Sequence, residues 1–69
     1  MTDNEFLLRV LRQAHGWLSR DEIIRRSQHE RGYGLTVHSR AADLRKQGHT
    51  VECKVAGAPR RQSFYRIAA

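Results

Sequence analysis

Apolar residues recur at the spacing of an amphipathic helix near the start of the chain. On a helix of about 3.6 residues per turn they fall on one face: Phe6, Leu7, Val10, Leu11 and Ala14. Thr2 and Glu5 form the pattern of a capping box, which satisfies free backbone N–H groups where a helix begins. Gly16 is expected to adopt the left-handed conformation that ends a helix. These positions predict a helix over about residues 3–15.

The pattern changes after this helix, where two apolar residues at positions 17–18 leave room only for a very short strand. Ser19 and Glu22 form a second capping box and predict a helix over about residues 20–28. This helix is expected to bury Ile23, Ile24 and Ser27 and to expose Arg25 and Arg26. The polar segment His29–Gly34 contains two glycines and predicts a long loop.

A third helix is predicted over about residues 37–47, with Thr36 as its N-cap and Gly48 at its end. Its buried seam is narrow and consists of Val37, Ala41 and Leu44. Its exposed and flanking positions carry polar and basic side chains: His38, Ser39, Arg40, Arg45 and Lys46. Asp43 also points outward. We expect its carboxylate to pair with Arg40 or Lys46 on the same helix, or to accept a hydrogen bond from a cytosine amino group.

Two segments that alternate between apolar and polar residues follow, separated by a turn at Ala56–Gln62 that contains glycine and proline. They predict a β-hairpin over about residues 50–67. One face of the hairpin is expected to be buried: Val51, Cys53, Val55, Tyr65 and Ile67. Cys53 is accordingly expected to be a partly buried structural thiol, whereas Phe64 and Arg66 are expected to face outward.

The composition narrows the range of functions. A length of 69 residues predicts one domain, residues 1–69. Thirteen Lys and Arg against seven Asp and Glu give a net charge of +6 and a pI near 10.8, which favours a polyanionic partner. No apolar run approaches the roughly 20 residues that span a bilayer, and the first residues lack a signal-peptide pattern. Together with a single cysteine, which fits a reducing compartment, these features predict a cytoplasmic protein without a membrane partner.

The order of helix, short strand, helix, helix and hairpin resembles the winged helix-turn-helix superfamily, in particular its small bacterial and phage members. GWLSRDEIIRRS is similar to the first strand and second helix of that superfamily, and SFYRI to its closing strand. TVHSRAADLRKQGHTVECK is similar to its recognition helix and first wing strand. The resemblance covers about residues 5–67. It implies an α+β fold with three helices, a short strand after the first helix and a C-terminal β-hairpin wing.

The resemblance also implies a function, that of a small transcriptional regulator bound to double-stranded DNA. The third helix would enter the major groove and present His38, Ser39, Arg40 and Lys46 to the bases. Arg60 and Arg61 lie where the wing tip would contact flanking DNA, and Arg45 is expected to contact phosphate or the second helix. Because one domain has a small footprint, we expect a homodimer or a protein partner. The candidate surfaces for that contact are Phe6, Leu7 and the outward Phe64.

Two other functions are compatible with these residues. A winged-helix domain can serve as an adaptor whose basic surface binds an acidic protein, and an excisionase-like protein bends DNA as an architectural factor. The four histidines and Cys53 match no metal-ligand spacing such as Cys-x-x-Cys. The sequence also contains no phosphate-binding glycine loop and no serine elbow. We therefore expect no metal, no cofactor, no small-molecule ligand and no enzymatic activity.

Overall fold

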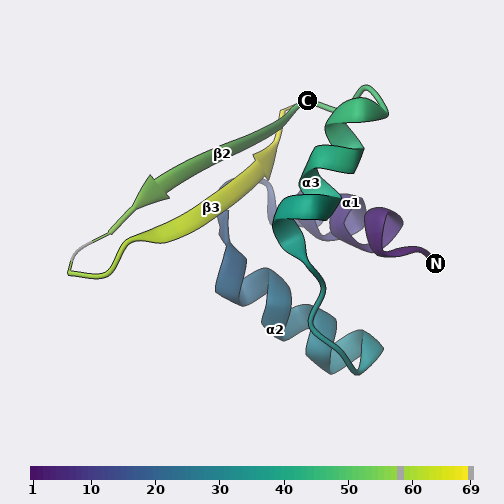
Figure 1. Cartoon of the computed structure of the whole chain (residues 1–69), viewed down its shortest axis with the longest axis horizontal. Helices are drawn as coiled ribbons and strands as arrows, with labels where there is room; N and C mark the ends of the chain where they lie inside the picture. The colour runs from purple at the N-terminus through teal and green to yellow at the C-terminus, as the bar shows by residue number, and fades with distance from the viewer. Residues whose placement is uncertain (58, 69) are drawn as a thin grey trace.

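The computed structural model describes residues 1–57 and 59–68. Within this range the chain forms α1 (Asp3–Ala14), β1 (Leu18–Ser19), α2 (Arg20–Arg31), α3 (Val37–Lys46), β2 (Val51–Ala56) and β3 (Gln62–Ile67) (Figure 1). The described residues thus make an α+β fold of three helices and a three-stranded antiparallel sheet, a layout compatible with a winged helix. None of these helices is both long enough and apolar enough to cross a membrane.

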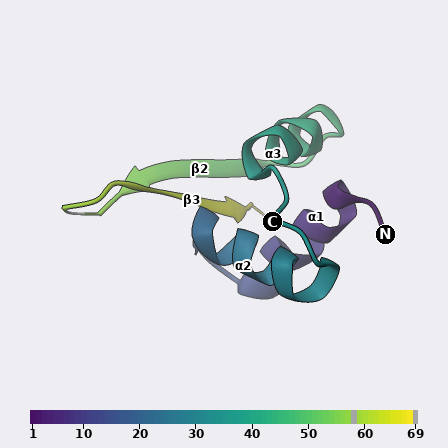
Figure 2. The same ribbon diagram turned by 60° about the horizontal axis from the view of Figure 1, so that its bottom comes forward.

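The sheet has the strand order β1–β3–β2, so β3 pairs on both sides. Tyr65 of β3 lies opposite Leu18 of β1 and opposite Cys53 of β2. The β2–β3 hairpin extends away from the helices, as Figures 1 and 2 show from two directions. Only its base is therefore in a position to share a core with the helices.

The core lies between the three helices and the base of the hairpin. Ile23 of α2, Leu44 of α3 and Tyr65 of β3 pack around the apolar face of α1. Phe6 and Leu7 of α1 are both 0% exposed, so the prediction that they form a dimer surface is wrong. Burying a side chain of this size contributes about 1.5–3 kcal/mol. Exposing both residues to a partner would remove much of the stability of so small a domain.

The N-terminal caps of α1 and α2 contain one of the two hydrogen bonds that define each predicted capping box. The hydroxyl groups of Thr2 and Ser19 accept hydrogen bonds from the backbone N–H groups of Glu5 at 3.2 Å and Glu22 at 3.1 Å. The Glu22 carboxylate, however, accepts hydrogen bonds from arginines of its own helix instead of closing the box. Thr36 occupies the N-cap of α3, but its side chain makes no capping hydrogen bond, contrary to prediction.

α1 and α2 both end on left-handed residues. At the end of α1 this residue is His15, with φ of 54°, and not the predicted Gly16. Histidine is among the residues that tolerate this conformation best after glycine. α2 continues to Arg31, past its predicted end, and stops at Gly32 with φ of 81°. The connection to α3 is therefore short, and the prediction of a long loop from His29 is wrong.

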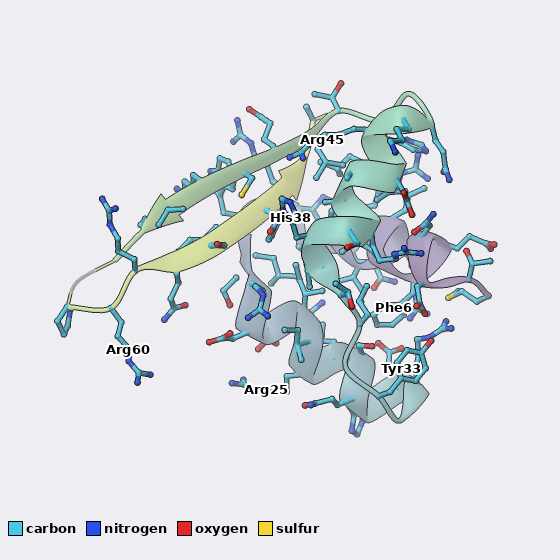
Figure 3. All side chains as sticks on the ribbon, in the orientation of Figure 1. Phe6, Arg25, Tyr33, His38, Arg45 and Arg60 are labelled. Atoms are coloured by element: carbon cyan, nitrogen blue, oxygen red, sulfur yellow. The ribbon has the colours of Figure 1, made fainter. Side chains whose placement is uncertain are left out.

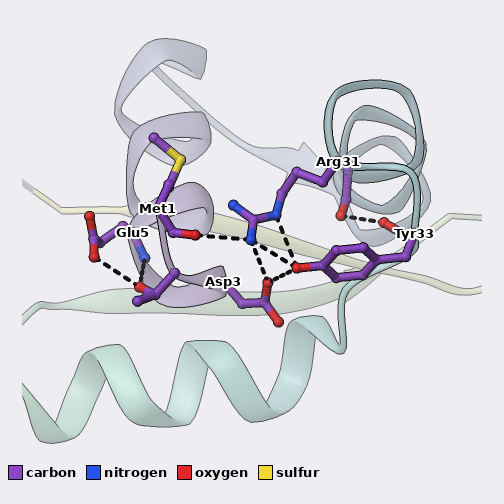
Figure 4. Close-up of polar contacts among 7 residues, drawn as sticks. Met1, Asp3, Glu5, Arg31 and Tyr33 are labelled. Carbon is purple, nitrogen blue, oxygen red and sulfur yellow. Dashed lines mark hydrogen bonds and ion pairs between the residues drawn. The ribbon is translucent and has the colours of Figure 1, made fainter.

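Contacts with α1 account for the additional turn of α2. Arg9 pairs with Glu30 at 2.8 Å, and Asp3 pairs with Arg31 at 3.3 Å. The hydroxyl of Tyr33 donates to the Asp3 carboxylate and accepts from the Arg31 guanidinium (Figure 4). The partners on α1 are more than twenty residues away in the sequence, so helical periodicity alone does not identify them.

Exposure along the hairpin differs from the prediction. Val51 is buried at the base of β2, but Cys53 is exposed and Val55 is 56% exposed. The prediction of a partly buried Cys53 is therefore wrong. The alternation correctly places Cys53 on the same face as its opposite residue, the buried Tyr65. The described helices cover that face only near the base of the hairpin (Figure 2).

The other face of the sheet carries aromatic rings in contact with cations. The Lys54 ammonium lies 4.5 Å from the centroid of the Trp17 ring and 5.9 Å from that of Phe64. The Arg66 guanidinium lies 4.6 Å from the Trp17 ring. Phe64 thus lies on the outward face, as predicted, but it is only partly exposed and already contacts a side chain of its own sheet.

Candidate nucleic-acid interface

α3 presents its polar face to solvent because its apolar seam is narrow. Val37, Ala41 and Leu44 are buried, as predicted. His38 and Ser39 at its start and Arg45 and Lys46 at its end are all exposed. In the view of Figure 3, His38 and Arg45 lie on the side of α3 toward the hairpin. The helix therefore offers polar side chains along its length, beside the hairpin.

Arg40, the remaining candidate on α3, is engaged on its own helix. Its Nη2 atom lies 3.1 Å from Oδ2 of Asp43, which confirms the predicted intrahelical pair. Both side chains are about one-third exposed, at 34% and 35%. Such a pair contributes only about 0.3–0.5 kcal/mol, so a stronger anionic partner can open it at small cost. Lys46 has no carboxylate partner among residues 1–57 and 59–68.

Arg45 connects α3 to the hairpin. Its Nε donates a hydrogen bond to the carbonyl oxygen of Val51 at 2.9 Å. This partner belongs to β2 and not to α2, which was one of the two partners expected for Arg45, and contact with phosphate stays a prediction. The hydrogen bond joins the end of α3 to the start of β2.

Arg60 and Arg61 are exposed where the hairpin returns into β3. They line a hollow of about 340 Å³ together with Arg20 and Asp21 from the start of α2 (Figure 3 labels Arg60). Arg20 was not among the predicted site residues, although its position at the start of a predicted helix could have indicated it. A cation in the first turn of a helix opposes the helix dipole, which favours negative charge there. Asp21, at 3.8 Å from Arg20, only partly offsets this charge.

Tyr65 belongs to the core and lies beneath this surface. Its ring is buried, and burial raises the pKa of its hydroxyl above the usual 10; the adjacent Cys53 thiol raises it further. The positive charges of Arg20 and Arg45 act in the opposite direction. The hydroxyl therefore stays protonated at neutral pH. The groups that influence it belong to α2, α3 and β2, the elements that surround the end of its ring.

The distribution of charge distinguishes this surface from the rest of the molecule. Of the thirteen Lys and Arg, seven lie within 4 Å of a carboxylate among the described residues. The other six are Arg12, Arg45, Lys46, Lys54, Arg60 and Arg61. Five of these six belong to the end of α3 or to the hairpin, and only Arg12 belongs to α1. The uncompensated positive charge is therefore concentrated on α3 and the hairpin.

The described part of the chain contains no group of three or more His, Cys, Asp or Glu side chains that could hold a metal ion. Comparisons of the chain with protein-family models, with curated proteins and with solved structures found no match. The basic surface on α3 and the hairpin is therefore the feature of the molecule that indicates a function.

Proposed function

We propose that the chain is a winged-helix DNA-binding protein, in which α3 is the recognition helix and the β2–β3 hairpin is the wing. The observation that carries this proposal is the concentration of uncompensated cations on those two elements. Duplex DNA presents about one negative charge per 1.7 Å of its axis, so a continuous basic surface is what its backbone requires. The order of the elements and the antiparallel sheet are compatible with this assignment.

The exposed side chains divide into two roles. Lys46, Arg60 and Arg61 contact phosphates and supply affinity and orientation, which carry no sequence information. His38 and Ser39 face the base edges in the major groove, where each base pair shows a distinct pattern of donors and acceptors. Arg40 joins them when its weak pair with Asp43 opens.

Arg45 has a third role in this proposal, which is to hold the recognition helix and the wing at a fixed angle. Its hydrogen bond to Val51 joins the end of α3 to the start of β2. A single domain of this type buries roughly 600–1,000 Å² on DNA. Since that area is small, the correct angle between helix and wing matters for engaging both at once. A small transcriptional regulator acting in the cytoplasm fits this description best.

The first test is selection from a pool of duplexes with a randomised core at about 150 mM salt, followed by sequencing of the bound DNA. We expect one enriched motif. His38→Ala and Ser39→Ala should each relax the preference at one or two base pairs, with a loss of about 1–3 kcal/mol for the preferred site. Arg12→Ala is the matched control, because Arg12 is an exposed cation on α1. It should leave the motif unchanged.

Each other result has a defined meaning. Binding without an enriched motif would contradict sequence readout and favour an architectural role, which DNA bending assays would then show. Failure to bind any duplex even at low salt would exclude DNA as the partner. The same basic surface would then have to serve an acidic protein, the adaptor function.

A further inference from the structure

β2 lies at the edge of the sheet, with no further strand on its outer side among the described residues. It is the last strand in the order β1–β3–β2, and its register with β3 runs from residue 51 to residue 56 without a bulge. Proteins usually protect such an edge with charged side chains, proline, a bulge or covering structure, because its free backbone groups can pair with another chain. The charged residues of β2, Glu52 and Lys54, have opposite signs, so they do not repel a second copy as a row of lysines would. Here Cys53 and Val55 are exposed, and the strand contains no proline.

The hydrogen bonds show which residues of β2 face the open edge. The carbonyl of Thr50 accepts from the N–H of Ala68 at 2.9 Å, so position 50 points toward the β3 side. Backbone groups alternate in direction along an antiparallel pair. The residues that point to the open edge are therefore Val51, Cys53 and Val55. An independent contact agrees, since Arg45 reaches the Val51 carbonyl.

The sequence of this edge is self-complementary. Residues 51–55 read Val-Glu-Cys-Lys-Val, which is symmetric about Cys53 except that Glu52 and Lys54 have opposite charges. When two copies lie antiparallel with Cys53 opposite Cys53, each Glu52 faces Lys54 of the other copy. Each Val51 then faces a Val55. Opposite charges and β-branched pairs are the cross-strand combinations that stabilise a sheet.

We propose that β2 pairs with β2 of a second copy of this chain, antiparallel about Cys53, so that the two sheets join into one. The contact is isologous, because the same strand of each copy meets its equivalent. The ladder uses backbone groups of Val51, Cys53 and Val55 that are not engaged with β3. The Val51 carbonyl can accept a second hydrogen bond beside that of Arg45, since a carbonyl oxygen has two lone pairs.

The charges that this pairing uses are present at neutral pH. The hydrogen bond from Arg66 lowers the pKa of Glu52 below its usual value, so the carboxylate is ionised. Lys54 contacts the aromatic rings of Trp17 and Phe64, and its side chain lies on the same outward face of the sheet as that of Glu52. A single strand pair buries less than the roughly 1,200 Å² of a stable interface, so the dimer is weak. We expect a dissociation constant between about 10 µM and 1 mM.

Val55→Pro tests the strand pairing selectively. Proline lacks the N–H that points to the open edge at position 55, whereas the bonds between β2 and β3 do not use this N–H. Sedimentation velocity up to about 1 mM protein should show a monomer–dimer equilibrium for the natural chain. Val55→Pro removes two hydrogen bonds per dimer and should raise the dissociation constant about tenfold or more. Val55→Thr keeps the N–H and the branched side chain and should change it less than about threefold. Circular dichroism verifies that the natural chain and both variants are folded.

The register has its own test in disulfide formation under mild oxidation. Directly opposed residues have Cα atoms about 5.5 Å apart, within the range of a disulfide, so Cys53 should link two copies. In the double variant Cys53→Ser, Val55→Cys the two thiols would be separated by about 13 Å and should link far more slowly. A chain that remains monomeric at about 1 mM would overturn the proposal. So would a dimer unaffected by Val55→Pro, or faster linking through position 55.

Discussion

Ser27 is the polar side chain that the described core buries completely, and its hydroxyl donates a hydrogen bond to the Tyr33 carbonyl at 2.6 Å. This contact joins the last turns of α2 to the connection before α3. The side chain of Tyr33 holds the same connection to α1, through Asp3 (Figure 4). These polar contacts join the connection that precedes α3, the proposed recognition helix, to both α1 and α2.

Ser27→Ala should lower the free energy of unfolding by about 0.5–1.5 kcal/mol, because it removes the hydrogen bond from a buried hydroxyl to the Tyr33 carbonyl. Urea denaturation followed by circular dichroism measures this change. Ser39→Ala is the matched control, since the same atoms are removed from an exposed helical position, and it should stay within about 0.5 kcal/mol of the natural chain. Equal stability of the two variants would show that the Ser27 contact adds nothing.

The residue pattern predicted which side of an element a residue occupies better than whether that side is covered. Val37, Ala41 and Leu44 are buried as the helical spacing required. Cys53 and Val55 lie on the predicted face of β2, yet they are exposed, because alternation does not show how far the hairpin extends past the helices. Arg45 likewise could be placed on α3 but not matched to Val51, since that contact depends on how two elements pack.

At the scale of whole elements, the ends of α1 and α2 show that a glycine after a helix need not be its left-handed residue. Gly32 adopts φ of 81° at the end of α2, whereas Gly16, after α1, is not left-handed; the left-handed residue there is His15. An added Cβ would meet nothing within 4 Å at either glycine. The two positions therefore differ in backbone conformation and not in available space.

Gly32→Ala should destabilise the domain by about 1–2 kcal/mol, because a non-glycine residue is strained in the left-handed region. Gly16→Ala should be neutral or stabilise the domain by up to about 1 kcal/mol, since it only reduces the freedom of the unfolded chain. Denaturant unfolding of both variants provides the comparison. If Gly16→Ala were the more damaging variant, Gly16 and not His15 would be the left-handed residue at the end of α1.

The types and order of the elements followed from the sequence, but the length of α2 did not. Its core residue Ile23 and its cap Ser19 were predictable from local pattern. Its last turn has no apolar periodicity and is held by ion pairs to α1, such as that of Glu30 with Arg9. Those partners become neighbours only after the helices pack, so no local pattern predicts the true end of α2.

For the molecule as a whole, the placement of charge matters more than its total. The net charge of +6 was evident from composition, and it favoured a polyanionic partner without locating the contact surface. In the folded chain most carboxylates are paired with arginines, and the uncompensated cations gather on α3 and the hairpin. If DNA binds at α3 and the hairpin, removing a cation there should weaken binding more than removing a cation elsewhere on the molecule.

Arg60→Ala and Arg12→Ala remove the same charge from two exposed positions, one on the hairpin and one on α1. For a phosphate contact, the plot of log affinity against log salt should become shallower by about 0.9, so Arg60→Ala should show that change and Arg12→Ala should not. Fluorescence anisotropy with one duplex between about 50 and 200 mM salt measures both slopes. Equal reductions for the two variants would mean that DNA responds to net charge alone. The hairpin would then have no special role in binding.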